Sequence, residues 1–193
     1  MVLPALEIGQ PAAAHIFDPE SGYQSPANVA EHTLDPHDTA NDIEQAGLNS
    51  DYLLSYISST DPSVSTEVAL FDTADQASEF VETTVGEAAE RYKGASLPNG
   101  VDLMRVEAAK LDEPGKTAYR ATVTGAFHGE TFEVTVVGFN KGRVAGFVYL
   151  SGTPVAADAL ALKLSRRIGA VAAGKIPDKP VTATDPTPVQ VLP

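Results

Sequence analysis

The sequence predicts a single α+β domain in which helices cover one antiparallel sheet of about six strands, in the order α-ββ-α-ββββ-α. Between residues 101 and 151, segments that alternate apolar and polar residues follow one another, separated by turns too short for a parallel crossover. Two longer segments, at 73–94 and 153–174, carry apolar residues at helical spacing instead. A chain of 193 residues, 43% hydrophobic and 20% charged, suits one globular domain.

Both ends of the chain are expected to lie outside this domain, which we assign to residues 36–174. Residues 1–35 are rich in Pro, Ala, Gly, Ser and Asp without sustained periodicity. They are predicted to form an extended leader or an arm that lies over the domain. Residues 175–193 contain five prolines and are predicted to form an extended tail.

The first predicted elements of the domain are a short helix and two strands. Asp35-Pro36 supplies an N-cap followed by a proline at the first helical position, and Gly47 can end the helix. Residues 52–58 and 66–71 are two short runs bounded by turn-forming residues, which is typical of consecutive strands.

The segment 73–94 has the strongest helical pattern in the chain. Thr73 and Gln76 have the spacing of a capping box, and Gly94 can end the helix. Its apolar residues recur along one helix face: Ala77, Phe80, Val81, Val85, Ala88 and Tyr92. This face is expected to pack on the sheet.

Four strands and a final helix complete the domain. The strands are expected at 102–111, 118–127, 130–140 and 143–150. His128-Gly129 and Asn140-Lys141-Gly142 are hairpin signals, which impose antiparallel pairing. Thr153-Pro154 then supplies a cap and an N1 proline for the last helix. The apolar stripe of that helix consists of Ala157, Leu160, Ala161, Leu164, Ile168 and Val171.

The formal net charge of −13 is unevenly distributed. Residues 1–90 contain no Lys or Arg and carry a formal charge of −17, whereas the remainder carries +4. An acidic surface repels phosphate backbones and anionic lipid, so nucleic-acid binding and electrostatic membrane binding are not expected. The charge pattern favours solubility and attraction between the two halves.

Several classes of site and segment are excluded by residue content. The chain has no cysteine, which excludes disulfides, thiolate nucleophiles, thiolate zinc sites and iron–sulfur centres. No stretch approaches the ~20 apolar residues of a membrane-spanning helix. Residues 1–16 lack the basic region of a signal peptide. The chain is therefore expected to be either cytoplasmic or the mature form of an exported protein.

One cluster of ligand-type residues lies in the segment 31–44. His32, Asp35, His37 and Asp38 are candidate metal ligands, because imidazole and carboxylate groups bind divalent ions. The spacing of the two histidines matches no known site, and Asp35 is already expected to cap a helix. A solvated acidic helix start is the leading interpretation, and a metal site or a hydrolytic enzyme centred on this segment is the alternative.

No motif for other catalytic chemistry is present. The sequence lacks a G-x-S-x-G nucleophile motif and phosphate-binding glycine loops, and nothing singles out a catalytic pair among its acids and histidines. We therefore predict no catalytic residue and no cofactor, and a non-enzymatic role is favoured.

Aromatic residues on the predicted strands give a different indication. Together with glycines nearby, they leave room for an apolar pocket between sheet and helices. The candidate ligand-binding residues are Tyr52, Tyr56, Tyr119, Phe147 and Tyr149. A fully packed core is the alternative interpretation of the same residues.

Four short motifs in residues 65–172 resemble those of exported bacterial proteins of the actinobacterial lipoprotein or sensor-like type. They are Phe71-Asp72-Thr73, Phe139-Asn140-Lys141-Gly142, Val144-Ala145-Gly146-Phe147-Val148 and Arg166-Arg167-Ile168. The resemblance implies a fold and a location in the cell envelope or outside the cell, but it supplies no catalytic residue. The lipid-bearing cysteine of such lipoproteins is not in this sequence.

We accordingly predict a non-enzymatic cell-envelope or secreted module that binds a small apolar ligand or a protein partner. The alternatives are the metal-binding or hydrolytic role of segment 31–44, and a structural subunit whose Pro-rich arms clasp a neighbouring chain. The oligomeric state and the strand order are left open by the sequence.

Overall fold

The computed structural model describes residues 1–8, 16–17, 21–32, 40–57, 63–97, 100–151 and 154–175. Its strands are β1 (Ile16–Phe17), β2 (Gly22–Gln24), β3 (Leu48–Ile57), β4 (Val64–Phe71), β5 (Val101–Lys110), β6 (Ala118–Phe127), β7 (Glu130–Lys141) and β8 (Val144–Leu150). Its helices are α1 (Ala5–Ile8), α2 (Pro26–His32), α3 (Ala40–Gln45), α4 (Ala74–Val81), the π-helical η2 (Glu82–Gly86), α5 (Ala88–Tyr92) and α6 (Pro154–Ala172).

All the described strands belong to one antiparallel sheet, as the sequence predicts. The sheet has eight strands in the order β1-β3-β4-β8-β7-β6-β5, and β2 also pairs with β3. The expected number was about six, because β1 and β2 have only two and three residues and show no alternation that a sequence pattern could reveal. The other six strands begin and end within four residues of their predicted bounds.

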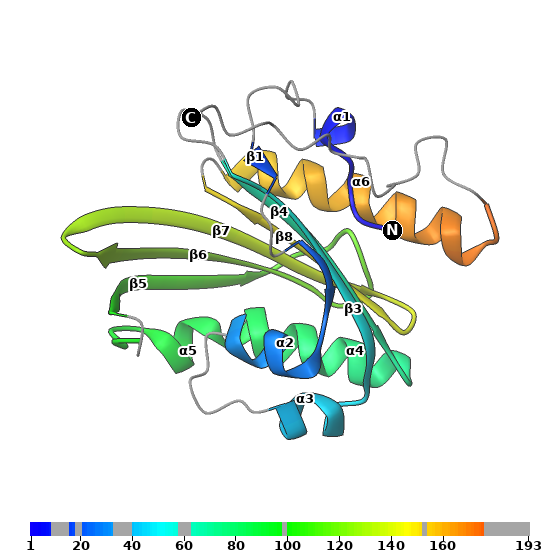
Figure 1. The fold of residues 1–193 in the computed structure, drawn as a ribbon, viewed down its shortest axis with the longest axis horizontal. Helices are drawn as coiled ribbons and strands as arrows, with labels where there is room; N and C mark the ends of the chain where they lie inside the picture. Colours follow the sequence, from blue (N-terminus) through cyan, green and yellow to red (C-terminus); the bar gives the residue numbers. More distant parts are fainter. Residues whose placement is uncertain are drawn as a thin grey trace.

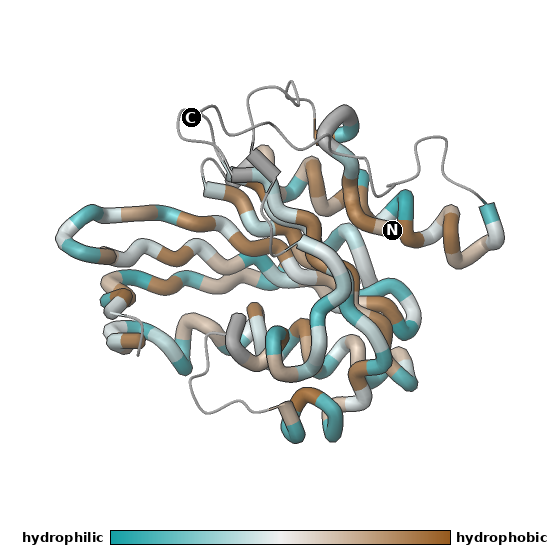
Figure 2. The backbone as a smooth tube through the Cα atoms, in the orientation of Figure 1, coloured by the Kyte–Doolittle hydropathy of each residue, from teal (hydrophilic) through white to brown (hydrophobic). Residues whose placement is uncertain are grey.

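Helices cover the two faces of the sheet, so the molecule has three layers (Figure 1). On one face α6 packs against β7 and β8, with Phe139, Leu164 and Ile168 fully buried between them. On the other face the helical segment α4–η2–α5 crosses the sheet from β4 to β5 and buries Phe71, Val81 and Val85. Figure 2 shows apolar residues concentrated along the central strands and alternating with polar residues toward the β6–β7 hairpin.

The turns follow the predicted chemistry. His128 (φ 52°) and Gly129 (φ 85°) both have positive φ, which a type I′ hairpin turn requires. Thr73 and Gln76 form the predicted capping box, with the Thr73 hydroxyl accepting from the Gln76 N–H and the Gln76 side chain accepting from the Thr73 N–H. Of the first predicted helix, the described part is α3, which Gly47 follows with φ 84°.

The helix predicted at 73–94 is not continuous. Its middle turn, η2, is π-helical, and the Glu87 N–H donates to the Glu82 carbonyl five residues earlier. Gly86 lies in this turn against Tyr119, whose ring atoms would be 3.1 Å from a Cβ at position 86. A methyl group there would require the Tyr119 ring to shift by a few tenths of an ångström. Periodicity alone did not reveal the extra residue, because the apolar stripe continues through it.

Residues 1–8 pack on the domain and contribute to its core. Val2 and Leu3 are buried in the core on the α6 face, and the Leu3 N–H donates to Thr66 Oγ1 over 3.2 Å. The carboxylate of Glu7 forms an ion pair with Arg167 of α6 at 2.6 Å. These contacts are with residues far away in the chain, so the local sequence carried no sign of them.

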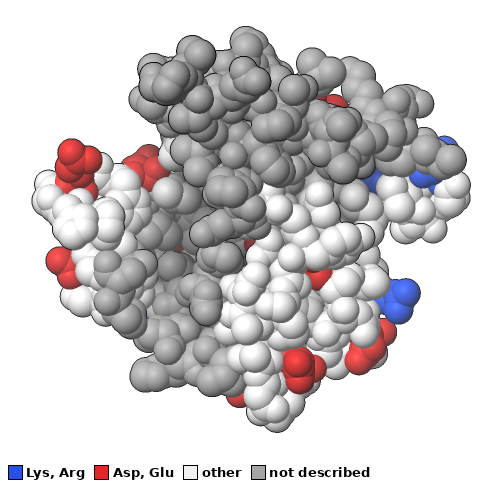
Figure 3. All heavy atoms as spheres, in the orientation of Figure 1, with Lys and Arg blue, Asp and Glu red and all other residues white. Residues whose placement is uncertain are grey.

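On the face shown in Figure 3, acidic side chains lie at the hairpin end, along the lower edge and at the lower right, and the visible basic side chains lie toward the right of the view. Within the described residues, no helix is both long enough and apolar enough to cross a membrane.

Two glycine substitutions test the close packing of helix on sheet. A Cβ at position 138 of β7 would lie 2.8 Å from Val85 Cγ2 and 2.9 Å from the Phe147 ring. We expect Gly138→Ala to lower the free energy of unfolding by about 1–3 kcal/mol, because η2 or the ring must move. Urea denaturation followed by circular dichroism measures the change.

Gly169→Ala in α6 is the matched control. A Cβ there would meet only the flexible end of Lys141, at 2.7 Å from Nζ, and alanine favours the helix by up to about 1 kcal/mol. Equal destabilisation by both substitutions would contradict the packing argument.

Candidate functional site

A cavity of about 290 Å³ lies between η2–α5 and the face of the sheet formed by β5, β6, β7 and β8. Its volume is that of about ten water molecules at liquid density, which suits a ligand of about ten heavy atoms. The lining residues are Thr84, Val85, Ala88, Leu97, Val101, Leu103, Ala121, Val123, Phe132, Val134, Val136 and Tyr149. Thr84 and Tyr149 are the hydroxyl-bearing residues of this lining, and every other lining side chain is a hydrocarbon.

The cavity exists because small residues meet where the helix crosses the sheet. Ala88 of α5 and Ala121 of β6 are both buried, yet each contributes only a methyl group to the wall. Phe132 lies across Gly125 of the neighbouring strand, where a Cβ would be 2.5 Å from the ring. This ring takes up the space over β6, next to the exposed Phe127 at the hairpin end.

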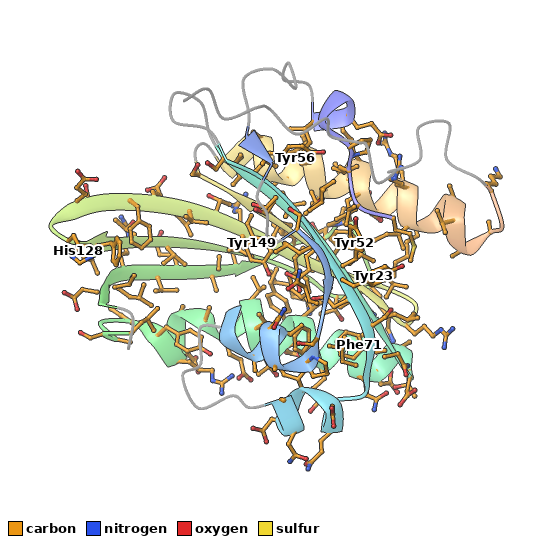
Figure 4. All side chains as sticks on the ribbon, viewed as in Figure 1. Tyr23, Tyr52, Tyr56, Phe71, His128 and Tyr149 are labelled. Atoms are coloured by element: carbon orange, nitrogen blue, oxygen red, sulfur yellow. The ribbon has the colours of Figure 1, made fainter. Side chains whose placement is uncertain are left out.

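Beside the cavity, the same sheet face carries a polar network on β3, β4 and β8. Tyr149 lines the cavity, pairs with Val136 on one side and with Ser65 on the other, and donates its hydroxyl to Glu67 Oε2 over 2.7 Å. Asp51 shares a side-chain hydrogen bond with Glu67 and is only 2% exposed. Figure 4 shows Tyr149 near the middle of the sheet, the position from which this network extends.

Burial and the charge of Glu67 together keep protons on this network. Burial is the main reason that the pKa of Asp51 is raised to about 9, and the charge of Glu67 and the hydrogen bond with it raise this pKa further. A backbone hydrogen bond with Tyr52 acts in the opposite direction. Burial and then the charge of Glu67 also raise the pKa of Tyr149 well above its usual value. Asp51 and Tyr149 are therefore protonated at neutral pH and donate to the Glu67 carboxylate.

A second, more polar cleft of about 370 Å³ lies on the other side of the helical segment, against α3. It is lined by Asp42, Ile43, Gln45, Ala46, Gln76, Glu79, Phe80, Thr83, Thr84, Arg91 and Tyr92. Thr84 of η2 lines both spaces. The π-helical turn therefore separates an apolar cavity from a mixed cleft.

The structure divides the five aromatic candidates between the two faces of the sheet. Tyr149 lines the cavity, Phe147 is buried beside it with the two rings stacked at 6.3 Å, and Tyr119 packs on η2 of the same face. Tyr52 and Tyr56 belong to the core on the α6 face, and Tyr52 meets the exposed Tyr23 edge to face (Figure 4). The aliphatic lining and the Asp51–Glu67 pair were not anticipated. Alternation on each strand could have placed the aliphatic residues on one face.

The predicted metal ligands lie largely outside the described residues. This is the case for Asp35, His37 and Asp38, and His32 is described only as the last backbone position of α2. Among the described side chains, no group of three or more His, Asp or Glu residues could hold a metal ion. A metal or hydrolytic site in 31–44 stays a prediction.

Comparison with known proteins identifies the fold. No protein-family model matches the chain, and no curated protein matches it. Among solved structures, the chain is similar to the extracellular domain of PknH from Mycobacterium tuberculosis, with a TM-score of 0.56 and 16% identity over 87% of this chain and 92% of that one. At this identity the likeness concerns the fold alone.

The buried network predicts a pH-dependent stability that a single substitution removes. Between its ordinary pKa of 3.8 and its folded value of about 9, Asp51 binds a proton in the folded chain but loses it on unfolding. Stability contributed by this proton is complete below pH 3.8 and is lost as the pH rises toward 9. Asn has no proton to lose and can still donate to Glu67. We therefore expect Asp51→Asn to raise the free energy of unfolding by about 2 kcal/mol at pH 7.5 and hardly at all at pH 4.

Urea denaturation at the two pH values measures this difference. An effect of Asp51→Asn that is equal at pH 4 and pH 7.5 would show that Asp51 is ionised in the folded chain.

Proposed function

We propose that this chain is a non-enzymatic module of the cell envelope, or a secreted one, that binds a small apolar ligand in the cavity beneath η2 and α5. The observation that carries the proposal is the hydrocarbon lining of that cavity, ten side chains from both layers around a space of about 290 Å³. Burying a ligand methylene group in such a space stabilises the complex by about 0.8 kcal/mol.

A small ligand is favoured over a protein partner by where the apolar surface lies. Among the described residues, the exposed large hydrophobic side chains are four: Met1, Tyr23 of β2, Met104 of β5 and Phe127 of β6. A protein interface has a contiguous core of such residues. Apolar groups are concentrated in the cavity instead, where ten lining side chains are hydrocarbon.

The location is supported by two observations of a different kind. The motifs at residues 65–172 resemble exported bacterial domains, and the fold is similar to a domain that is extracellular in another protein. We expect an antibody to detect the protein in the envelope fraction or culture medium of its source organism. Recovery only with cytoplasmic marker proteins would contradict an exported location.

Binding of 1-octanol tests the cavity directly, because its nine heavy atoms match the volume. We expect heat of binding with a stoichiometry near one in isothermal titration calorimetry. Val134→Phe should weaken binding about tenfold or more, because the partly buried Val134 lines the cavity and the larger ring takes up part of the space for the ligand.

Thr131→Phe is the control, since it adds the same ring to β7 on the opposite face, at an exposed position. No binding of 1-octanol or of any other eight-carbon amphiphile to the unmodified protein, or equal loss in both variants, would refute the proposed function. Native mass spectrometry of protein from its own source then identifies the natural ligand by an excess mass that is lost on denaturation.

A further inference from the structure

The polar network and the apolar cavity form two parts of one sheet face. Directly paired residues in antiparallel strands point to the same side, so Val136, Tyr149 and Ser65 share a face. Glu67 lies two residues from Ser65, and Asp51 lies two residues from Leu53, the partner of Glu67. The face therefore changes from hydrocarbon on β5–β7 to hydroxyl and carboxyl groups on β8, β4 and β3, with Tyr149 belonging to both parts.

Among the described residues, no cation lies in an ion pair with the negative charge of this polar part. Within the described chain, neither Asp51 nor Glu67 has an ion-pair partner. Three basic side chains have partners at α6 or at the N-terminal segment: Arg120 with Asp158, Lys141 with the Ser165 carbonyl, and Arg167 with Glu7. These contacts are on the opposite face. A partly buried charge without a partner is costly, and a bound cation reduces this cost.

The network also contains a hydrogen-bond acceptor without a donor. Within the part of the chain that the structure describes, Asp51 Oδ1 is buried and has no hydrogen-bond partner, while the proton of this carboxyl group is shared with Glu67. A buried acceptor without a donor costs about 1–3 kcal/mol. The position therefore suits a ligand group that brings N–H donors and a positive charge together. A primary ammonium group has three such donors.

We propose that the ligand is an amphiphilic amine, with a hydrocarbon chain in the cavity and a protonated amino group bound by Glu67, Asp51 and Tyr149. This inference rests on the proposed function and specifies its ligand class. A carboxylate head group would be repelled by Glu67, and an alcohol would satisfy the free acceptor but not the charge.

Three ligands with the same eight-carbon chain distinguish the contribution of the head group to binding affinity from that of the chain. Calorimetric titration at pH 7 with n-octylamine, 1-octanol and octanoate uses the unmodified protein and requires no variant. We expect octylamine to bind at least about tenfold more tightly than octanol, since hydrogen bonds to charged groups are the stronger ones, and octanoate to bind most weakly. Octylamine binding no tighter than octanol would overturn the inference and leave the proposed function intact. Failure of all three ligands would refute both.

The substitution Glu67→Gln tests whether the amino group of the ligand binds to this network. It should reduce octylamine affinity about tenfold and reduce octanol affinity much less, so the preference for the amine is lost. An unchanged circular dichroism spectrum shows that the variant is folded. Glu133→Gln removes one charge at an exposed position on the other face of β7 and should change neither affinity. Equal octylamine affinity in the unmodified protein and in Glu67→Gln would place the amine elsewhere and contradict the assignment.

Discussion

The burial of β8 on both faces is the constraint on which the rest of the structure depends. This strand lies between β4 and β7, and all of its residues are buried except the partly buried Tyr149. Its side chains are apolar on both sides, so a helix must cover each face. Glycines on the strands allow the helices to approach the sheet closely. Gly138 of β7 has Val85 of η2 against it, and Gly146 of β8 has Ile168 of α6 against it.

The cavity forms because a single helical segment covers a wide sheet face and does not fill all the space over it. The segment α4–η2–α5 packs firmly on the central strands and then continues over β5 and β6, where Ala88 and Ala121 leave space. The π-helical turn falls at this point of the crossing. Such turns insert one residue into a helix and occur often at functional sites. Here it places Val85 on Gly138 while Thr84 remains beside the cavity.

The sequence was sufficient for the fold class because the main elements have strong local patterns. Hairpin chemistry at His128-Gly129 and the capping box at Thr73 fixed the bounds of their elements within a few residues. Elements that depend on distant contacts were missed. Leu3 is buried by β4 and α6, and β2 exists by pairing with β3, so neither has a local signal.

The candidate site was predictable only in part, for the same reason. An aromatic residue on β8 was expected near a pocket, and Tyr149 does line the cavity. The sequence could not show that Tyr149 lies on one face of the sheet while Tyr52 and Tyr56 lie on the other. The face that each residue occupies depends on the strand order and the pairing register. Asp51 and Glu67 were two acids among 26, and their pairing depends on the register of β3 against β4.

Packing alone gives no reason for two carboxyl groups to meet on this face. Apolar residues of similar size at buried ion or carboxyl pairs are often neutral or stabilising, so Asp51 and Glu67 cost the fold free energy that Val or Leu would not. The neighbouring positions show that the strands accept apolar residues, since Ala69 and Phe147 occupy the same face and are buried. Proteins retain such local exceptions mainly where function needs them. The Asp51–Glu67 pair lies beside the hydroxyl group of Tyr149, which lines the cavity. Its cost to stability and its position are therefore explained together if the pair serves the ligand.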